Sequence, residues 1–260
     1  MTTGFIAGAM YLAILFVGSV PFVLLATIIA VITLLELAAM KHISLRSPGV
    51  LLSAAFTAAL VFAAPFLKGS EFQTYFIRLL VLLVLVLLAA VVFSKNRFQI
   101  EEASFLFFFV SYIGFSFYLL AQLRLESLLL VLFVQITMWA TDSGAYFVGR
   151  KLGRHKLAPH ISPNKTVEGS IGAVAAAFLV AAVFQFIIRR PLFASAGLFV
   201  TVTLIISVLG QVGDLAESAV KRHFGVKDSG DILPGHGGFF DRFDSLIFVL
   251  PVLYLAGMIS

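Results

Sequence analysis

The residues best able to do chemistry gather in one stretch of the sequence, residues 214–244. Although 61% of the chain is hydrophobic, this stretch holds six of its 13 acidic residues and four of its 18 basic residues. They are Asp214, Glu217, Lys221, Arg222, Lys227, Asp228, Asp231, Asp241, Arg242 and Asp244. Charged groups are costly near hydrocarbon, so this concentration predicts a functional site.

Carboxylates in this stretch have the spacing of a metal site. Asp214 and Glu217 share one stripe of a predicted helix with Ser218. Oxygen ligands of this kind suit Mg²⁺, so we predict Asp214 as a ligand, the alternative being a structural ion pair. Asp241 is predicted as the second ligand and Asp244 as a ligand or its support. Both open the last apolar segment, where capping of the helix dipole is the alternative. The number of carboxylates also leaves room for a second cation beside Mg²⁺, such as K⁺.

Basic and glycine residues lie among these carboxylates. Lys221, Arg222 and Lys227 are predicted to bind phosphate groups, although such residues also serve as interfacial anchors. The sequence Pro-Gly-His-Gly-Gly at 234–238 predicts a turn whose backbone N–H groups approach phosphate oxygens. His236 within it is a general acid for a leaving group or a hydrogen-bonding loop residue, and the sequence leaves both readings open.

A second polar segment runs from Trp139 to Gly169. Asp142 lies within an apolar segment, and the basic stretch after it leads to Lys165 and Glu168. We predict functional roles for all three residues, against the simpler readings of a positively charged cytoplasmic loop and a helix cap. Glu36, Glu101 and Glu102 have no matching basic cluster and are predicted to be interfacial or structural.

Composition and apolar runs predict an integral membrane protein. Only 12% of the 260 residues are charged, and the chain has no cysteine, which excludes disulfides and thiolate catalysis. Continuous apolar stretches predict an all-α polytopic bundle of about nine transmembrane helices rather than a β-barrel. The predicted spans are 4–18, 20–40, 49–67, 72–93, 101–122, 126–148, 167–188, 195–218 and 243–259.

Basic residues orient this bundle. With the N-terminus inside, 13 of the 18 basic residues fall on the cytoplasmic side. The two polar loops, 149–166 and 219–242, then face the cytoplasm, where a soluble nucleotide reaches them. We divide the chain into an N-terminal transmembrane scaffold of about four helices, residues 1–94, and a catalytic transmembrane region, residues 95–260.

The polar motifs resemble those of one enzyme family. The pattern S-x-x-K-R-x4-K-D, followed by L-P-G-H-G-G-x-x-D-R-x-D, begins at Ser218 and ends at Asp244. The segments DSxAYFxG from Asp142 and SPxKxxEG from Ser162 match as well. Together they resemble the signature of phosphatidate cytidylyltransferases, also called CDP-diacylglycerol synthases. The resemblance is strongest over about 139–254.

This resemblance implies substrates, partners and residue roles. The substrates would be CTP and phosphatidic acid, with Mg²⁺ as cofactor, and the partners the lipid bilayer and a second copy of the chain, but no nucleic acid. The location would be the bacterial inner membrane. Catalytic roles are expected for Lys165, Lys221, Arg222, Lys227, Asp228 and His236. Substrate binding is expected for Asn164, Glu168, Ser218, Gly235, Gly237, Gly238 and Arg242. Metal binding is expected for Asp142, Asp214, Asp241 and Asp244.

Two other functions compete with this one. A CTP-dependent lipid-alcohol kinase would also use a nucleotide, a metal and a membrane, but it would release CDP instead of pyrophosphate. A transporter would also carry charged residues within the membrane. It predicts polar residues through the whole membrane thickness and internal repeats, neither of which the sequence displays.

Overall fold

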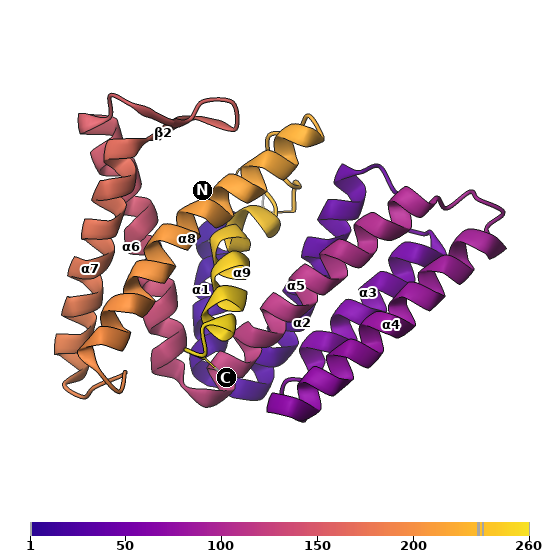
Figure 1. Cartoon of the computed structure of the whole chain (residues 1–260), viewed down its shortest axis with the longest axis horizontal. Coiled ribbons are helices and arrows are strands. Elements are labelled where there is room, and N and C mark those ends of the chain that lie inside the picture. Colours follow the sequence, from indigo (N-terminus) through magenta and orange to yellow (C-terminus); the bar gives the residue numbers. More distant parts are fainter. Residues whose placement is uncertain (1, 233–234, 236, 260) are drawn as a thin grey trace. The chain divides into compact units, whose positions relative to one another are not determined.

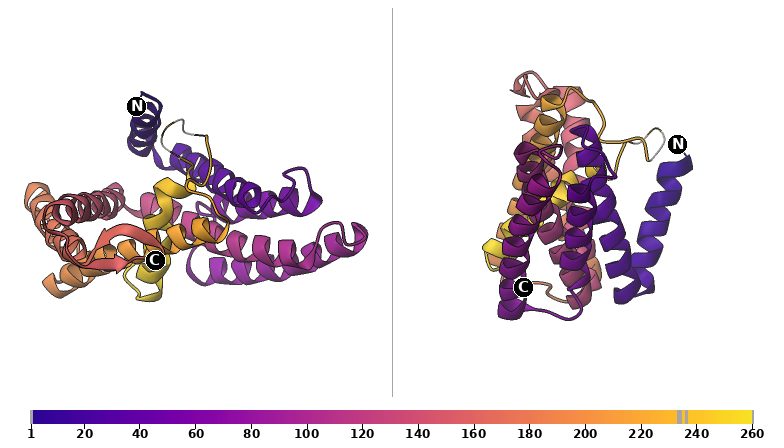
Figure 2. Two further views of the ribbon diagram at one scale, coloured as in Figure 1. Left: turned by 90° about the horizontal axis from the view of Figure 1, so that it is seen from above. Right: turned by 90° about the vertical axis from the view of Figure 1, so that its right-hand side faces the viewer.

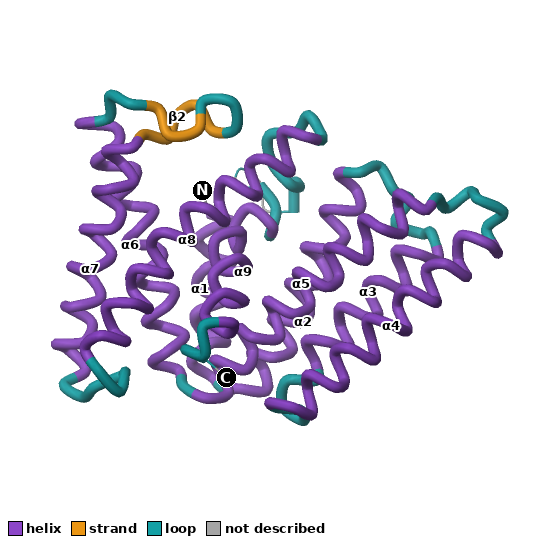
Figure 3. The backbone as a smooth tube through the Cα atoms, in the orientation of Figure 1, coloured by secondary structure: helices purple, strands orange, loops and turns teal. Residues whose placement is uncertain are grey.

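The computed structural model describes residues 2–232, 235 and 237–259. In these residues the chain forms nine α-helices and one β-hairpin (Figures 1 and 3). The elements are α1 (Thr2–Val17), α2 (Ser19–Met40), α3 (Pro48–Phe62), α4 (Gly69–Phe93), α5 (Ile100–Glu126), α6 (Leu128–Leu152), β1 (Lys156–Ala158), β2 (Ser162–Thr166), α7 (Val167–Ile188), α8 (Ala196–His223) and α9 (Phe240–Leu255).

The predicted helical membrane protein is confirmed in its broad form. Among the described residues, six helices are long and apolar enough to cross a membrane: α2, α4, α5, α6, α7 and α8. By contrast, α1, α3 and α9 have 16, 15 and 16 residues. Helices of that length extend only about 24 Å, short of the ~30 Å hydrocarbon core. A bundle of nine membrane crossings therefore stays a prediction.

The first compact unit combines Met1–Leu125 with the distant segment Val226–Arg242. Within it α1, α2, α3 and α4 pack successively against one another, and the turned views show α1 beside α2 (Figure 2). The aromatic ring of Phe72 in α4 stacks on Tyr118 of α5, with the ring centroids 3.3 Å apart. Phe22, Phe72 and Phe117 are fully or almost fully buried, so the apolar core of this unit reaches from α2 to α5.

The second unit combines Glu126–Gly225 with Phe243–Ile259. Its largest helix–helix interface joins α6 and α7. Small residues make this close packing possible, since a Cβ atom at Gly144 would lie 2.5 Å from the Cβ of Ala176 and 2.9 Å from the carbonyl oxygen of Gly172. Side-chain hydroxyls cap the helix starts, with Ser127 accepting from the N–H of Leu130 and Ser195 from that of Leu198.

The two polar loops are shorter than predicted, and one of them is not a simple loop. Because α6 continues to Leu152, the first connection begins at Gly153, and it folds into an antiparallel hairpin of β1 and β2 in place of the expected all-α arrangement. In the second, α8 runs to His223 and α9 begins at Phe240. Lys221 and Arg222 are therefore helical, as is Asp241. The functional division at residue 94 stays a prediction.

Candidate active site

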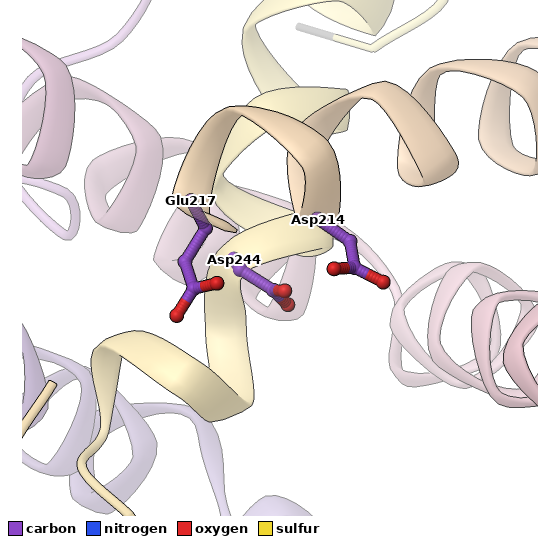
Figure 4. Close-up of side chains that lie close together, drawn as sticks. All are labelled: Asp214, Glu217 and Asp244. Atoms are coloured by element: carbon purple, nitrogen blue, oxygen red, sulfur yellow. The ribbon is translucent and has the colours of Figure 1, made fainter. Parts of the chain in front are cut away.

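Three carboxylates come together in the second unit. Asp214 and Glu217 project from α8 and Asp244 from α9, and one oxygen of each lies within 4.8 Å of the others (Figure 4). Glu217 is 3% exposed, so this group is partly withdrawn from water. Three carboxylate oxygens at this spacing are the donor set of a hard divalent cation such as Mg²⁺.

The close approach of α8 and α9 creates this cluster. Asp214 and Glu217 are three residues apart, which places them on one face of α8. On the same side, a Cβ atom at Gly213 would lie 2.7 Å from the Cβ of Phe248 and 3.0 Å from the carbonyl oxygen of Asp244. Only glycine lets the α9 backbone come this near, so Gly213 is what brings Asp244 to the two carboxylates of α8.

Two lysines balance part of the negative charge. Lys165 Nζ lies 2.6 Å from Asp214 Oδ2, and Lys221 Nζ lies 2.7 Å from Glu217 Oε1. Ser218 adds a long hydrogen bond, 3.5 Å, to the other oxygen of Asp214. Both ion pairs are at least partly withdrawn from water, so each lysine lowers the cost of holding its carboxylate partner there.

A pocket of about 500 Å³ adjoins Asp214 in the same unit. Its polar lining comes from α6, the hairpin, the first turn of α7 and α8. These residues are Asp142, Tyr146, Arg150, Asn164, Lys165, Thr166, Ser170, Gln211 and Asp214. The pocket thus combines carboxylates at one point with basic and amide groups around it, which is the chemistry that a nucleotide or a lipid phosphate requires.

The hairpin that carries Asn164 and Lys165 is held at both ends. Glu168, in the first turn of α7, accepts hydrogen bonds from the backbone N–H groups of Arg154 and His155, and its Oε1 lies 2.6 Å from His155 Nδ1. At the other end Thr166 caps α7 by accepting from the N–H of Gly169. Lys165 therefore projects from a fixed strand rather than from a mobile loop.

In the first unit, Asp241 organises the loop before α9. Its Oδ2 accepts hydrogen bonds from the N–H and hydroxyl of Ser229, both at 2.9 Å, and from the N–H of Gly238 at 2.8 Å. Gly237 has a φ of 75°, and a Cβ atom there would lie 2.5 Å from Asp241 Oδ2. The glycines at 237 and 238 thus let the chain fold tightly around one carboxylate.

Glu36 joins the same loop from α2. Its Oε1 accepts from the N–H of Phe239 at 2.8 Å, while Oε2 accepts from the N–H of Phe240 at 2.9 Å and from the Ser229 hydroxyl at 3.2 Å. Glu36 is only 4% exposed. It therefore occupies the N-terminus of α9, where the first N–H groups of a helix lack intrahelical partners.

Comparison with known proteins identifies the family. The sequence model of the cytidylyltransferase family matches residues 1–259. The chain belongs to the cytidylyltransferase family. A phosphatidate cytidylyltransferase of Staphylococcus epidermidis is 43% identical over 251 residues, covering 96% of this chain and 95% of the relative. Phosphatidate cytidylyltransferases of Bacillus subtilis and Staphylococcus aureus are 40% and 41% identical, covering 97% and 96% of this chain and 94% and 95% of those proteins.

The predicted site residues of this cytidylyltransferase fall in both units. In the second, the structure brings Asp142, Asn164, Lys165 and Asp214 to one pocket, and Asp214 and Asp244 to one carboxylate cluster. Lys221 and Ser218 contact that cluster, Glu168 supports the hairpin, and Arg222 is exposed at the end of α8. The phosphate-binding and catalytic roles predicted for these residues stay predictions.

In the first unit, Lys227, Asp228, Gly235 and Arg242 are exposed, and Gly237 and Gly238 enclose Asp241. The N–H of Gly238 donates to Asp241, so its contact with a phosphate group stays a prediction. The same holds for the pairing of Asp241 with Asp214 at one ion, which joins residues of the two units. His236, predicted as a general acid or a loop residue, lies outside the described residues.

Sequence reasoning left Glu217 out of the metal ligands of this cytidylyltransferase and did not identify the partners of Glu36. The sequence predicted that Glu217 lies on the same helix face as Asp214, but Glu217 was not predicted as a metal ligand. Its spacing of three residues from Asp214 was the signal that could have suggested this role. The structural reading of Glu36 agrees with its hydrogen bonds, but its partners are 193 to 204 residues away in the sequence. No local pattern could have indicated them.

Proposed function

We propose that this enzyme transfers the cytidylyl group of CTP to phosphatidic acid, giving CDP-diacylglycerol and pyrophosphate. The family match over residues 1–259 and the names of its relatives support the substrates. The observation that carries the proposal is the carboxylate cluster of Asp214, Glu217 and Asp244, next to which Lys165 leads into a polar pocket. A metal site beside an anion-binding pocket is what nucleotidyl transfer needs.

The carboxylate cluster is the site we assign to Mg²⁺. Its all-oxygen donor set fits a hard cation. Asp214, Glu217 and Asp244 hold the ion in this proposal, Asp142 and Asp241 contribute to the same network, and a second cation such as K⁺ lies beside it. When bound, Mg²⁺ neutralises the phosphate charge of CTP and polarises its oxygens.

The chain's own residues position the reacting groups. An oxygen of the lipid phosphate attacks the α-phosphorus of CTP in line, so the new P–O bond forms as the bond from the α-phosphorus to the bridging oxygen breaks. Pyrophosphate leaves with that electron pair. The lipid phosphate is already anionic near neutral pH, so no protein nucleophile is required. Lys165 and Lys221 turn from their carboxylate partners to the phosphate oxygens, where positive charge stabilises the transition state.

The remaining polar residues complete the substrate sites. Arg222, Lys227 and Arg242 offset the charge of two phosphate-bearing substrates, with Asp228 holding the basic groups in place. The glycines at 235, 237 and 238 form the turn around the phosphates, and His236 protonates the leaving pyrophosphate or fixes the turn. Ser218, Asn164 and Glu168 contact the substrates or hold the segments that do.

We place the enzyme in the bacterial plasma membrane with this site facing the cytoplasm. Six apolar helices and the bacterial relatives support a membrane location, and the distribution of basic residues supports the orientation. A homodimer is expected from the family resemblance.

The test is release of pyrophosphate by purified protein in detergent with CTP, phosphatidic acid and Mg²⁺. Release should require the lipid and the metal, and it should collapse in Asp214→Asn but persist in Glu101→Gln, which makes a matched change at an exposed carboxylate of α5. Release of CDP would establish the lipid-kinase alternative instead. A well-folded protein that releases neither product would contradict both enzyme functions and favour a transporter.

A further inference from the structure

A second pocket, of about 510 Å³, lies in the first unit. Its lining residues are distant in the sequence from the residues of the candidate active site. Residues of the connection between α2 and α3 and of the turn between α4 and α5 line it. Figure 1 shows both of these connections at the same end of their helices. Both α4 and α5 are candidate membrane spans, so the turn that joins them lies where hydrocarbon meets water. The pocket shares no lining residue with the pocket beside Asp214.

The walls of this pocket are locked together. A Cβ atom at Gly49 would overlap the ring of Phe98, so the α4–α5 turn packs directly on the first turn of α3. Ser94 donates its hydroxyl to the carbonyl oxygen of Val91 at 2.9 Å and accepts from the N–H of Phe98 at 3.0 Å. Between these fixed points Lys95 and Asn96 have φ values of 56° and 59°, an uncommon conformation for residues other than glycine. Such strained residues cluster at binding sites.

The polar lining of the pocket is that of a phosphate site. Lys95 and Arg97 line it together with a single carboxylate, Glu102, whose Oε2 already accepts the N–H of Gln99 at 2.9 Å. Ser44 and Ser47 also line the pocket. Ser47 is the N-cap of α3, with its hydroxyl oxygen accepting from the N–H of Val50, and the dipole of α3 favours an anion at this end of the helix. Arginine and lysine with hydroxyl donors are the groups that bind phosphate oxygens.

An apolar rim distinguishes this pocket from a site for free phosphate. Phe93 lines the pocket although this residue is 85% exposed, and it is the last residue of α4, a helix whose apolar residues Val81, Leu85 and Leu88 are exposed as well. An occupant with a charged head and hydrocarbon chains satisfies both surfaces at once. Inorganic phosphate would leave the apolar rim uncovered.

We propose that this pocket binds the phosphodiester headgroup of an anionic phospholipid. Lys95, Arg97 and the two serines hold the phosphate, and the acyl chains lie along Phe93 and the exposed face of α4. Basic pockets between membrane helices bind anionic headgroups in this way. The binding is independent of catalysis, because the lining residues have no part in the candidate active site.

The experiment compares lipid binding by native mass spectrometry, using phosphatidylglycerol as the anionic probe and phosphatidylcholine as the neutral one. The test variant is Lys95→Gln with Arg97→Gln. The matched control is Lys68→Gln with Arg78→Gln, which removes the same charge from exposed positions of the same unit that do not line the pocket. Circular dichroism checks that both variants fold.

The wild type and the control should retain phosphatidylglycerol about 30-fold more strongly than the test variant, and phosphatidylcholine binding should be equal in all three. Equal loss in the control would mean that only net charge matters, and unchanged binding in the test variant would mean that the lipid sits elsewhere. Either result overturns the proposal. So does displacement of phosphatidylglycerol by millimolar inorganic phosphate, because the pocket would then be a free-phosphate site.

Discussion

Glu36 should determine whether the loop before α9 keeps its shape. Replacing it by alanine removes the acceptor of two backbone N–H groups, those of Phe239 and Phe240, and of the Ser229 hydroxyl. A buried donor left without a partner costs about 1–3 kcal/mol. The two N–H groups together therefore predict a local loss of about 2–6 kcal/mol, while the Ser229 hydroxyl keeps its shorter hydrogen bond to Asp241.

Hydrogen exchange of individual amides measures this loss where it occurs. Since about 1.4 kcal/mol corresponds to a tenfold change, the amides of Phe239 and Phe240 in Glu36→Ala should exchange at least about 30-fold faster than in the wild type. Glu36→Gln should give a smaller effect, because its amide oxygen still accepts on one side while its NH₂ group faces an N–H on the other. Residues of α6 and α7, in the other unit, should exchange as before.

The matched control is Glu71→Ala, which removes an exposed carboxylate from the first turn of α4 in the same unit. It should leave both amides protected. Exchange at Phe239 and Phe240 that is the same in Glu36→Ala and Glu71→Ala would refute the reasoning. The hydrogen bonds of Glu36 would then contribute nothing to the order of the loop.

Three further predictions concern the second unit. Gly213→Val should lower the thermal midpoint and abolish Mg²⁺-dependent activity, because overpacking against the α9 backbone costs about 1–3 kcal/mol. The control is Gly197→Val, since a Cβ atom at Gly197 would meet only Ser195 Oγ, at an ordinary contact distance of 3.8 Å. Equal midpoints in the two variants would contradict this prediction. Lys165→Ala should lower kcat about 10²–10³-fold while the protein still folds. The control Lys156→Ala, which changes an exposed lysine of the same hairpin, should keep a kcat close to that of the wild type. Similar kcat values in the two variants would exclude a catalytic role for Lys165. Glu217→Gln should raise the Mg²⁺ concentration for half-maximal activity about tenfold or more, and an unchanged Mg²⁺ titration would remove Glu217 from the ligands.

The helices were predictable because hydrocarbon imposes a length and a polarity on them. Each of the nine apolar stretches became a helix whose ends differ from the prediction by a few residues, as α4 at Gly69–Phe93 illustrates. The hairpin was missed because β1 and β2 have three and five residues, and the sequence between Gly153 and Thr166 is mostly polar and basic. Segments this short form by pairing with each other and by their anchors, rather than by a period in the sequence.

The site was predictable where its residues are close along the chain. Asp214, Glu217 and Lys221 share a helix face, so helical spacing alone groups them. The contact of Asp244 with that group depends on the packing of α9 at Gly213, and the contact of Lys165 depends on the hairpin. Both are tertiary contacts. A single sequence shows only that the residues involved are polar residues in an apolar background.

The first unit is built from two segments that are far apart in the sequence, so its parts are synthesised at different times. Its first 125 residues leave the ribosome long before Val226–Arg242 exists, yet Glu36 finds its acceptor role only with that late segment. At about 5–20 residues per second, the roughly 200 intervening residues take on the order of 10–40 s to make. During that time Glu36, near the end of α2, lacks the hydrogen-bond donors that it has in the folded protein. A chain that stops before Val226 therefore leaves the first unit without the segment that supplies the hydrogen-bond donors of Glu36.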